Sequence, residues 1–153
     1  GGASSSRLFQ RIREELGLAY AIDSDVSLYD GGGALYIQAA VSPHQMARAA
    51  AEIGAVLRAL RTGVTAAEFD RAREGLRASL RMSMESSMSR AAYAGRTALT
   101  GSVRTDDEIL DQVAHVTRDD VNALAAELLD LDRLSVSVCG NAPHDWCKSF
   151  ANR

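Results

Sequence analysis

The sequence predicts an α+β fold, in which helices pack against an antiparallel-rich sheet in two layers. Apolar and polar residues alternate in residues 18–28 and again in residues 34–41, as they do in half-buried strands. A third alternation covers residues 133–139, and apolar residues recur at helical spacing in the long stretch between. These strands are few for so many helices, so we expect residues 1–153 to form a single partial domain that lacks its first strand.

The composition is that of a globular chain with a sizeable core. Of its 153 residues, 46% are hydrophobic, and the formal net charge of −3 gives no reason to expect nucleic acid or an anionic membrane as a partner. No apolar run reaches the roughly 18 residues of a membrane span. Two cysteines, Cys139 and Cys147, are too few for a disulfide framework. We therefore expect a reducing compartment, the bacterial cytoplasm, with the mitochondrial matrix as the alternative.

The first predicted elements are a helix and a β-hairpin. Four apolar residues at helical spacing predict a helix over about residues 5–16: Leu8, Phe9, Ile12 and Leu16. Gly17 follows where a left-handed cap would end that helix. The alternation that begins at Leu18 places Tyr20 on the apolar face of a strand. A turn at residues 30–33 would join this strand to the next, and no helix follows the triple glycine as a phosphate-binding loop requires.

Capping signals predict the helices of the middle region. The predicted starts are Ser42-Pro43 with Gln45, Thr65 with Glu68, Thr105 with Glu108, and Thr117 with Asp120. The serine-rich residues 83–89 are unusual inside a helix and predict a bend or a small-residue packing surface, with a substrate-facing groove as the alternative. Another helix is expected over residues 90–99, and residues 133–139 should return to the sheet as a strand.

No catalytic zinc motif is present in the sequence. A zinc hydrolase needs two close histidines and a carboxylate, whereas His44, His115 and His144 are far apart. Cys139, His144 and Cys147 fit no standard zinc module, and an ordinary strand-end cysteine and a tail thiol are the favoured interpretation. The nucleophile motif G-x-S-x-G is also absent. We predict no nucleophile, general base or metal ligand in this chain.

Arg13 and Tyr20 are the candidate site residues. Arg13 borders the apolar stripe of the first helix, where its permanently charged guanidinium needs acceptors, and the buried hydroxyl of Tyr20 needs a partner. A turn at Gly17 would let both donors converge on a peptide carbonyl or a developing oxyanion. From the spacing alone, a structural arginine paired with Glu14, Glu15 or a distant acid, together with a core tyrosine, is favoured.

The segment GGASSSRLFQRIREELGLAYAIDS resembles the start of the C-terminal half of the pitrilysin/insulysin superfamily of inverted-motif zinc peptidases, especially the branch that includes processing peptidases. The similarity continues through LYIQAAVSP, TGVTAAEFDRAR, SMESSMSRAAYAGR and DEILDQVAHVTRDDV. It therefore covers nearly the whole chain. Residues 140–153, GNAPHDWCKSFANR, fit the resemblance poorly and are expected to be a variable tail.

The resemblance implies a layered metallohydrolase-like half-domain without its own first strands. It implies that an N-terminal partner domain binds zinc through H-x-x-E-H and a downstream glutamate. It also places Arg13 and Tyr20, with their R-x6-Y spacing, against the substrate backbone at the scissile bond. With the resemblance, the interpretation of Arg13 and Tyr20 as a substrate-binding pair is favoured over that of a structural arginine and a core tyrosine. Because the zinc motif is absent from the chain, we do not expect catalysis by this chain alone.

The leading functional interpretation is a substrate-binding, non-zinc part of a zinc-dependent endopeptidase that cleaves peptides or presequences. Its partners would be a zinc-bearing domain or subunit and an extended peptide added to a sheet edge, and the assembly could be a dimer. The main alternative is a non-catalytic scaffold subunit of the same fold, like the core proteins of respiratory complexes. A third is a freestanding helical interaction module, which would require a stable monomer.

Overall fold

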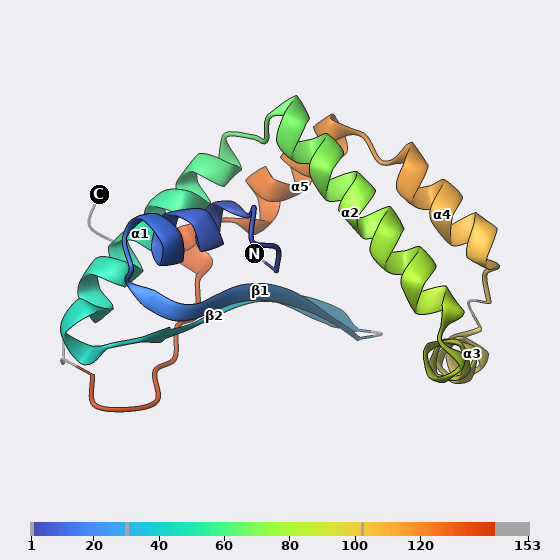
Figure 1. The fold of residues 1–153 in the computed structure, drawn as a ribbon, viewed down its shortest axis with the longest axis horizontal. Coiled ribbons are helices and arrows are strands. Elements are labelled where there is room, and N and C mark those ends of the chain that lie inside the picture. The colour runs from blue at the N-terminus through green and yellow to red at the C-terminus, as the bar shows by residue number, and fades with distance from the viewer. Residues whose placement is uncertain (1, 30, 102, 143–153) are drawn as a thin grey trace. The chain divides into compact units, whose positions relative to one another are not determined.

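The computed structural model in Figure 1 describes residues 2–29, 31–101 and 103–142. Contacts divide the chain into two compact units, of which residues 1–62 and 126–153 form the first and residues 63–125 the second. Helices predominate, and the described residues contain one two-stranded antiparallel sheet. The predicted α+β class is therefore confirmed.

The first unit begins with a helix and a hairpin, as predicted. The helix η1 (Phe9–Glu15) is wound as a π-helix. Strands β1 (Ala19–Tyr29) and β2 (Gly32–Val41) then pair antiparallel. A Cβ atom at Gly33 would lie 2.9 Å from the carbonyl oxygen of Ser27, so the end of this hairpin needs a residue without a side chain.

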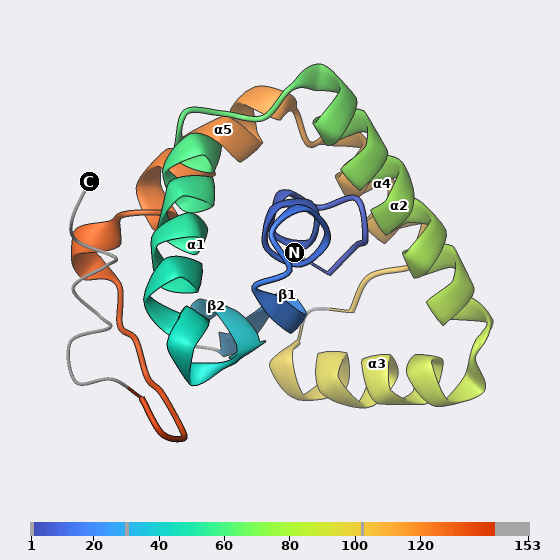
Figure 2. The ribbon, with the colours of Figure 1, turned by 60° about the vertical axis from the view of Figure 1, so that its left-hand side comes forward.

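The helix α1 (Met46–Arg61) follows a 3-10 turn, η2 (Pro43–Gln45). Figure 1 shows η1 and α1 on one side of the hairpin, and Figure 2, which views η1 end-on, shows α1 beside it. The most buried apolar residues of this unit are Leu8, Ile12, Leu18, Ala19, Ile22, Ala49, Ala50 and Leu57. The helix start predicted at Ser42 is correct, but the predicted capping box is absent because Ser42 makes no side-chain capping bond to the 3-10 turn.

The second unit contains the helices α2 (Ala66–Glu85), α3 (Ser87–Thr100), α4 (Asp106–His115) and most of α5 (Arg118–Leu128). The threonine caps of α2, α4 and α5 form as the sequence predicts, because capping depends on residues three positions apart. The predicted bend lies at Ser86, whose extended backbone separates α2 from α3. α2 packs against both α3 and α4.

The prediction that residues 133–139 form a strand is wrong. The chain passes through a 3-10 turn, η3 (Leu131–Arg133), and residues 134–139 form no ladder with β2 within the described part of the chain. Their apolar alternation is that of a strand, but Val136 and Val138 line a cavity together with residues of β2 and are not paired with that strand. Strand formation requires a neighbouring backbone edge at hydrogen-bonding distance, which alternation alone does not provide. Of the described helices, none is long and apolar enough to cross a bilayer.

Candidate functional site

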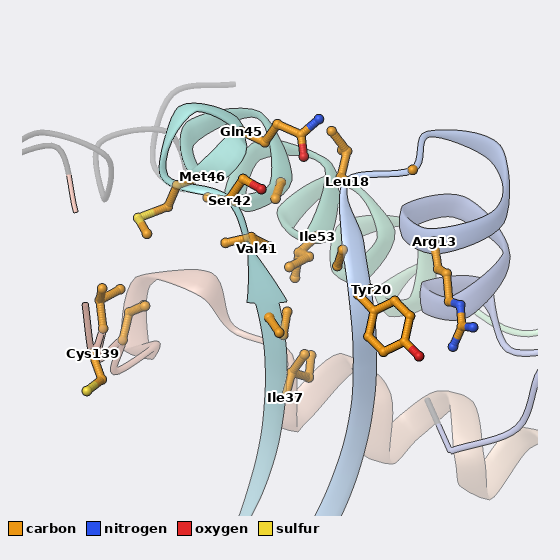
Figure 3. Close-up of a pocket in the computed structure, with 18 of the residues that line it drawn as sticks. Arg13, Leu18, Tyr20, Ile37, Val41, Ser42, Gln45, Met46, Ile53 and Cys139 are labelled. Atoms are coloured by element: carbon orange, nitrogen blue, oxygen red, sulfur yellow. The ribbon is translucent and has the colours of Figure 1, made fainter. Parts of the chain in front are cut away.

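The structure brings Arg13 and Tyr20 together. The guanidinium carbon of Arg13 lies 5.4 Å from the centroid of the Tyr20 ring and 4.8 Å from that of Phe9. Figure 3 shows the phenol and the guanidinium side by side next to β1. A cation held over an aromatic face at this distance is attracted by the ring's quadrupole. Arg13 therefore contacts two rings, one from η1 and one from β1.

Arg13 is carried by an irregular helix. Leu16 donates its backbone N–H to Arg11, five residues back, at 3.3 Å, and Leu18 donates to Ile12, six residues back, at 2.8 Å. Gly17 adopts a left-handed φ of 57°, which glycine reaches at little cost and which turns the chain from η1 into β1. Such π-helical turns are rare in proteins overall, and those that occur are often found at functional sites.

Tyr20 is carried by a second irregularity, a β-bulge. Ala19 pairs with Val41, and Ala21 pairs with Ala40, which is the neighbour of Val41. Tyr20 is therefore an extra residue in β1 that has no partner in β2. Two consecutive residues, Tyr20 and Ala21, are consequently exposed between the buried Ala19 and Ile22, and Tyr20 is 83% exposed. The prediction that Tyr20 lies on the apolar face of the strand is wrong, because the bulge shifts the alternation by one residue.

The polar environment leaves Arg13 donors for a ligand. Its Nε lies 3.6 Å from Glu14 Oε1 in an exposed ion pair, a kind that contributes little to stability. Glu15 is instead bound by Arg11, which also pairs with Glu52. The hydrogen bonds that Arg11 donates to these carboxylates raise its pKa, and the bond to Glu15 contributes most. Within the described ranges, no hydrogen bond to the Arg13 guanidinium or to the Tyr20 hydroxyl is found.

A cavity of about 910 Å³ adjoins this pair. Its walls come from the η1–β1 turn, from β2, from the start of α1 and from residues 136–139. They combine apolar side chains, including Ile37, Met46 and Ile53, with about as much polar surface. Figure 3 shows the segment around Cys139 on the side of β2 that faces away from β1. The volume is within the range of ligand pockets, about 300 to 1,000 Å³.

The other candidate residues do not join this site. No cluster of three potential metal ligands occurs among the residues that the structure describes. His115 Nδ1 lies 2.8 Å from the carbonyl oxygen of Asp111, at the C-terminal end of α4, and His44 is exposed in η2. Cys139 is an exposed free thiol, whereas His144 and Cys147 lie outside the described residues.

Phe9 is the residue that the sequence analysis missed. Its place in the apolar stripe of the first helix predicted a core side chain, yet Phe9 is half-buried and stacks on Arg13. The available signal was its spacing, because an aromatic residue four positions before an arginine on a helix is its surface neighbour.

Comparison with known proteins gives the family. Residues 1–76 match the family model described as the Peptidase M16 inactive domain. An uncharacterized zinc protease of Mycobacterium tuberculosis is 40% identical over 98% of this chain and 34% of its own length. The uncharacterized zinc protease YmxG of Bacillus subtilis is 36% identical over 94% of this chain and 36% of its own length. The chain belongs to the M16 peptidase family.

This M16 chain spans about a third of the length of these relatives. A third relative, an uncharacterized zinc protease of Streptomyces coelicolor, is 34% identical over 92% of the chain and 31% of its own length. The resemblance to the C-terminal half of the superfamily is therefore confirmed. Residues 1–76 of the M16 chain correspond to the domain that the family model describes as inactive, and Phe9, Arg13 and Tyr20 all lie within them.

Proposed function

We infer that this chain is the substrate-binding, non-zinc part of a zinc-dependent endopeptidase that acts on peptides or presequences. The observation that supports this most is the guanidinium of Arg13, which is stacked beside Tyr20 at a cavity and has no hydrogen bond within the described residues. The relatives named above are zinc proteases of bacteria, which favours a bacterial protein working in the cytoplasm.

Arg13 and Tyr20 act on the substrate as hydrogen-bond donors. Arg13 donates to a peptide carbonyl and orients it, and the exposed hydroxyl of Tyr20 donates to the substrate or to the oxyanion that develops on it. Neither side chain is the nucleophile or the base. The described residues do not form a zinc site, so we assign the metal to a partner domain or subunit.

The substrate binds in an extended conformation. Within the described residues β2 is paired on one side, by β1, and its other side borders the cavity. An extended peptide bound to a strand edge is held by backbone hydrogen bonds, which tolerate many side-chain sequences. This mode suits an endopeptidase that accepts varied peptides.

The test is hydrolysis of a quenched fluorescent peptide library by the intact protease, or by this chain reconstituted with its zinc-bearing partner. We expect chelator-sensitive cleavage whose kcat/KM falls roughly a hundredfold in Arg13→Ala and in Tyr20→Phe. Arg73→Ala is the matched control, because Arg73 also stacks on a phenylalanine, Phe69, but lies outside the site. Cleavage indifferent to Arg13→Ala and Tyr20→Phe would remove this site, and a folded assembly without activity would favour the scaffold.

A further inference from the structure

One of the two rings that the Arg13 guanidinium contacts is not used by the proposed function. Phe9 lies four residues before Arg13 on η1, and its centroid is 4.8 Å from the guanidinium carbon. The buried residues here are Ile12 of η1, which is 0% exposed, and Leu8, which directly precedes η1. Phe9 is half-buried, and its ring contacts the cation.

Arg13 needs such a partner because little else holds it. An arginine side chain has several rotatable bonds and loses considerable rotamer freedom when it is fixed in one orientation. Its ion pair with Glu14 is 3.6 Å long, and the two side chains are 40% and 52% exposed. An ion pair of this kind leaves the guanidinium free to move away from Tyr20. A second aromatic ring in contact with the guanidinium, that of Phe9 at 4.8 Å, restricts that motion.

We propose that Phe9 is a positioning residue for substrate binding. Its ring holds the guanidinium of Arg13 against Tyr20, so that both donors are presented to a peptide in one arrangement. This inference rests on the proposed function of Arg13 and Tyr20. Phe9 itself touches no reacting atom and acts through Arg13.

The chain contains a matched control for this contact. Phe69 and Arg73 have the same spacing of four residues on α2, and their ring-to-cation distance is 4.9 Å. Both phenylalanines are half-buried. Phe69→Leu therefore removes a ring from the same kind of pair in the second unit, which contributes no residue to the site.

The experiment measures kcat/KM for a quenched fluorescent peptide with the intact protease and its zinc-bearing part. We expect Phe9→Leu to lower kcat/KM about fivefold, because a partly exposed cation–π contact is lost. Phe9→Tyr, which keeps the ring, should stay within about twofold of the unaltered protein, and Phe69→Leu should not change it. In the Arg13→Ala background, Phe9→Leu should cause no further fall. If Phe9→Leu does not fold, Phe9→Met takes its place.

Two outcomes would overturn the proposal and can be told apart. If Arg13→Ala lowers kcat/KM but Phe9→Leu does not, Phe9 has no positioning role and the proposed function stands. If Arg13→Ala has no effect, the proposed function and this inference fail together. A fall in Phe9→Leu that persists in the Arg13→Ala background, or that Phe69→Leu reproduces, would show general destabilisation and would also refute the proposal.

Discussion

Replacing glycine by alanine should have opposite effects at two positions of this chain. Gly17 has a φ of 57°, and a Cβ atom added there would meet nothing within 4 Å. The cost of Gly17→Ala is therefore the left-handed backbone alone, about 1 to 2 kcal/mol for a residue with a side chain. Gly75 lies within α2 and also has open space around its Cβ position. Gly75→Ala should gain about 0.5 to 1 kcal/mol, because alanine loses less backbone entropy in a helix.

Urea unfolding of the intact protein, followed by circular dichroism, measures both free energies of unfolding. We expect the midpoint to fall for Gly17→Ala and to rise for Gly75→Ala, with a difference of about 2 kcal/mol between the variants. Because neither alanine creates a clash, packing cannot account for the opposite signs. Midpoints that shift in the same direction would refute the assignment of Gly17 to a left-handed turn between η1 and β1.

Two further predictions concern the second unit. Val64 donates its backbone N–H to Asn122 Oδ1 at 2.9 Å, so Asn122→Ala should lower the unfolding free energy by about 1 to 3 kcal/mol and speed hydrogen exchange at Val64, while Asn122→Asp keeps an acceptor. The pKa of Glu108 is lowered, first by the Thr105 backbone N–H at 2.6 Å and then by the Thr105 hydroxyl. At acidic pH the unfolded chain therefore binds more protons than the folded chain. The stabilisation of the fold by ionised Glu108 is complete above the pKa of an unfolded glutamate, about 4.3, and is lost as the pH falls through the lower pKa of the folded chain. The stability advantage over Glu108→Gln, measured by urea unfolding at several pH values, should therefore shrink in acid; an advantage that stays constant would contradict this.

The sequence predicts the parts of the fold that depend on short-range contacts. The caps at Thr65 and Thr105 form as expected because each requires two residues that are three positions apart. The strand at residues 133–139 was not predictable in the same way, since a ladder needs a partner far along the chain. Alternation identified the type of segment and could not identify its neighbour.

The candidate site was predictable in its residues and not in its geometry. Arg13 and Tyr20 are recognisable from the residues and the resemblance, and the structure places them next to each other. Their role in binding substrate stays a prediction. The alternation of apolar residues that begins at Leu18 does not reveal whether the strand contains a bulge. A regular strand was therefore predicted, which would place Tyr20 on the buried face. A π-turn likewise leaves no mark in the apolar pattern of η1.

Because of the bulge in β1 and the π-helical winding of η1, the geometry of the site depends on the number of residues between its side chains as well as on their identity. In a regular strand one residue more or less moves every later side chain to the opposite face, and in a helix it rotates them by about 100°. Removing a single residue between Arg13 and Tyr20 would therefore move the phenol away from the guanidinium while both residues remained in the sequence. A comparison of M16 chains that scores only matching letters would count such a chain as intact, whereas the spacing from Arg13 to Tyr20 and on to Ile22 would show that its site is lost.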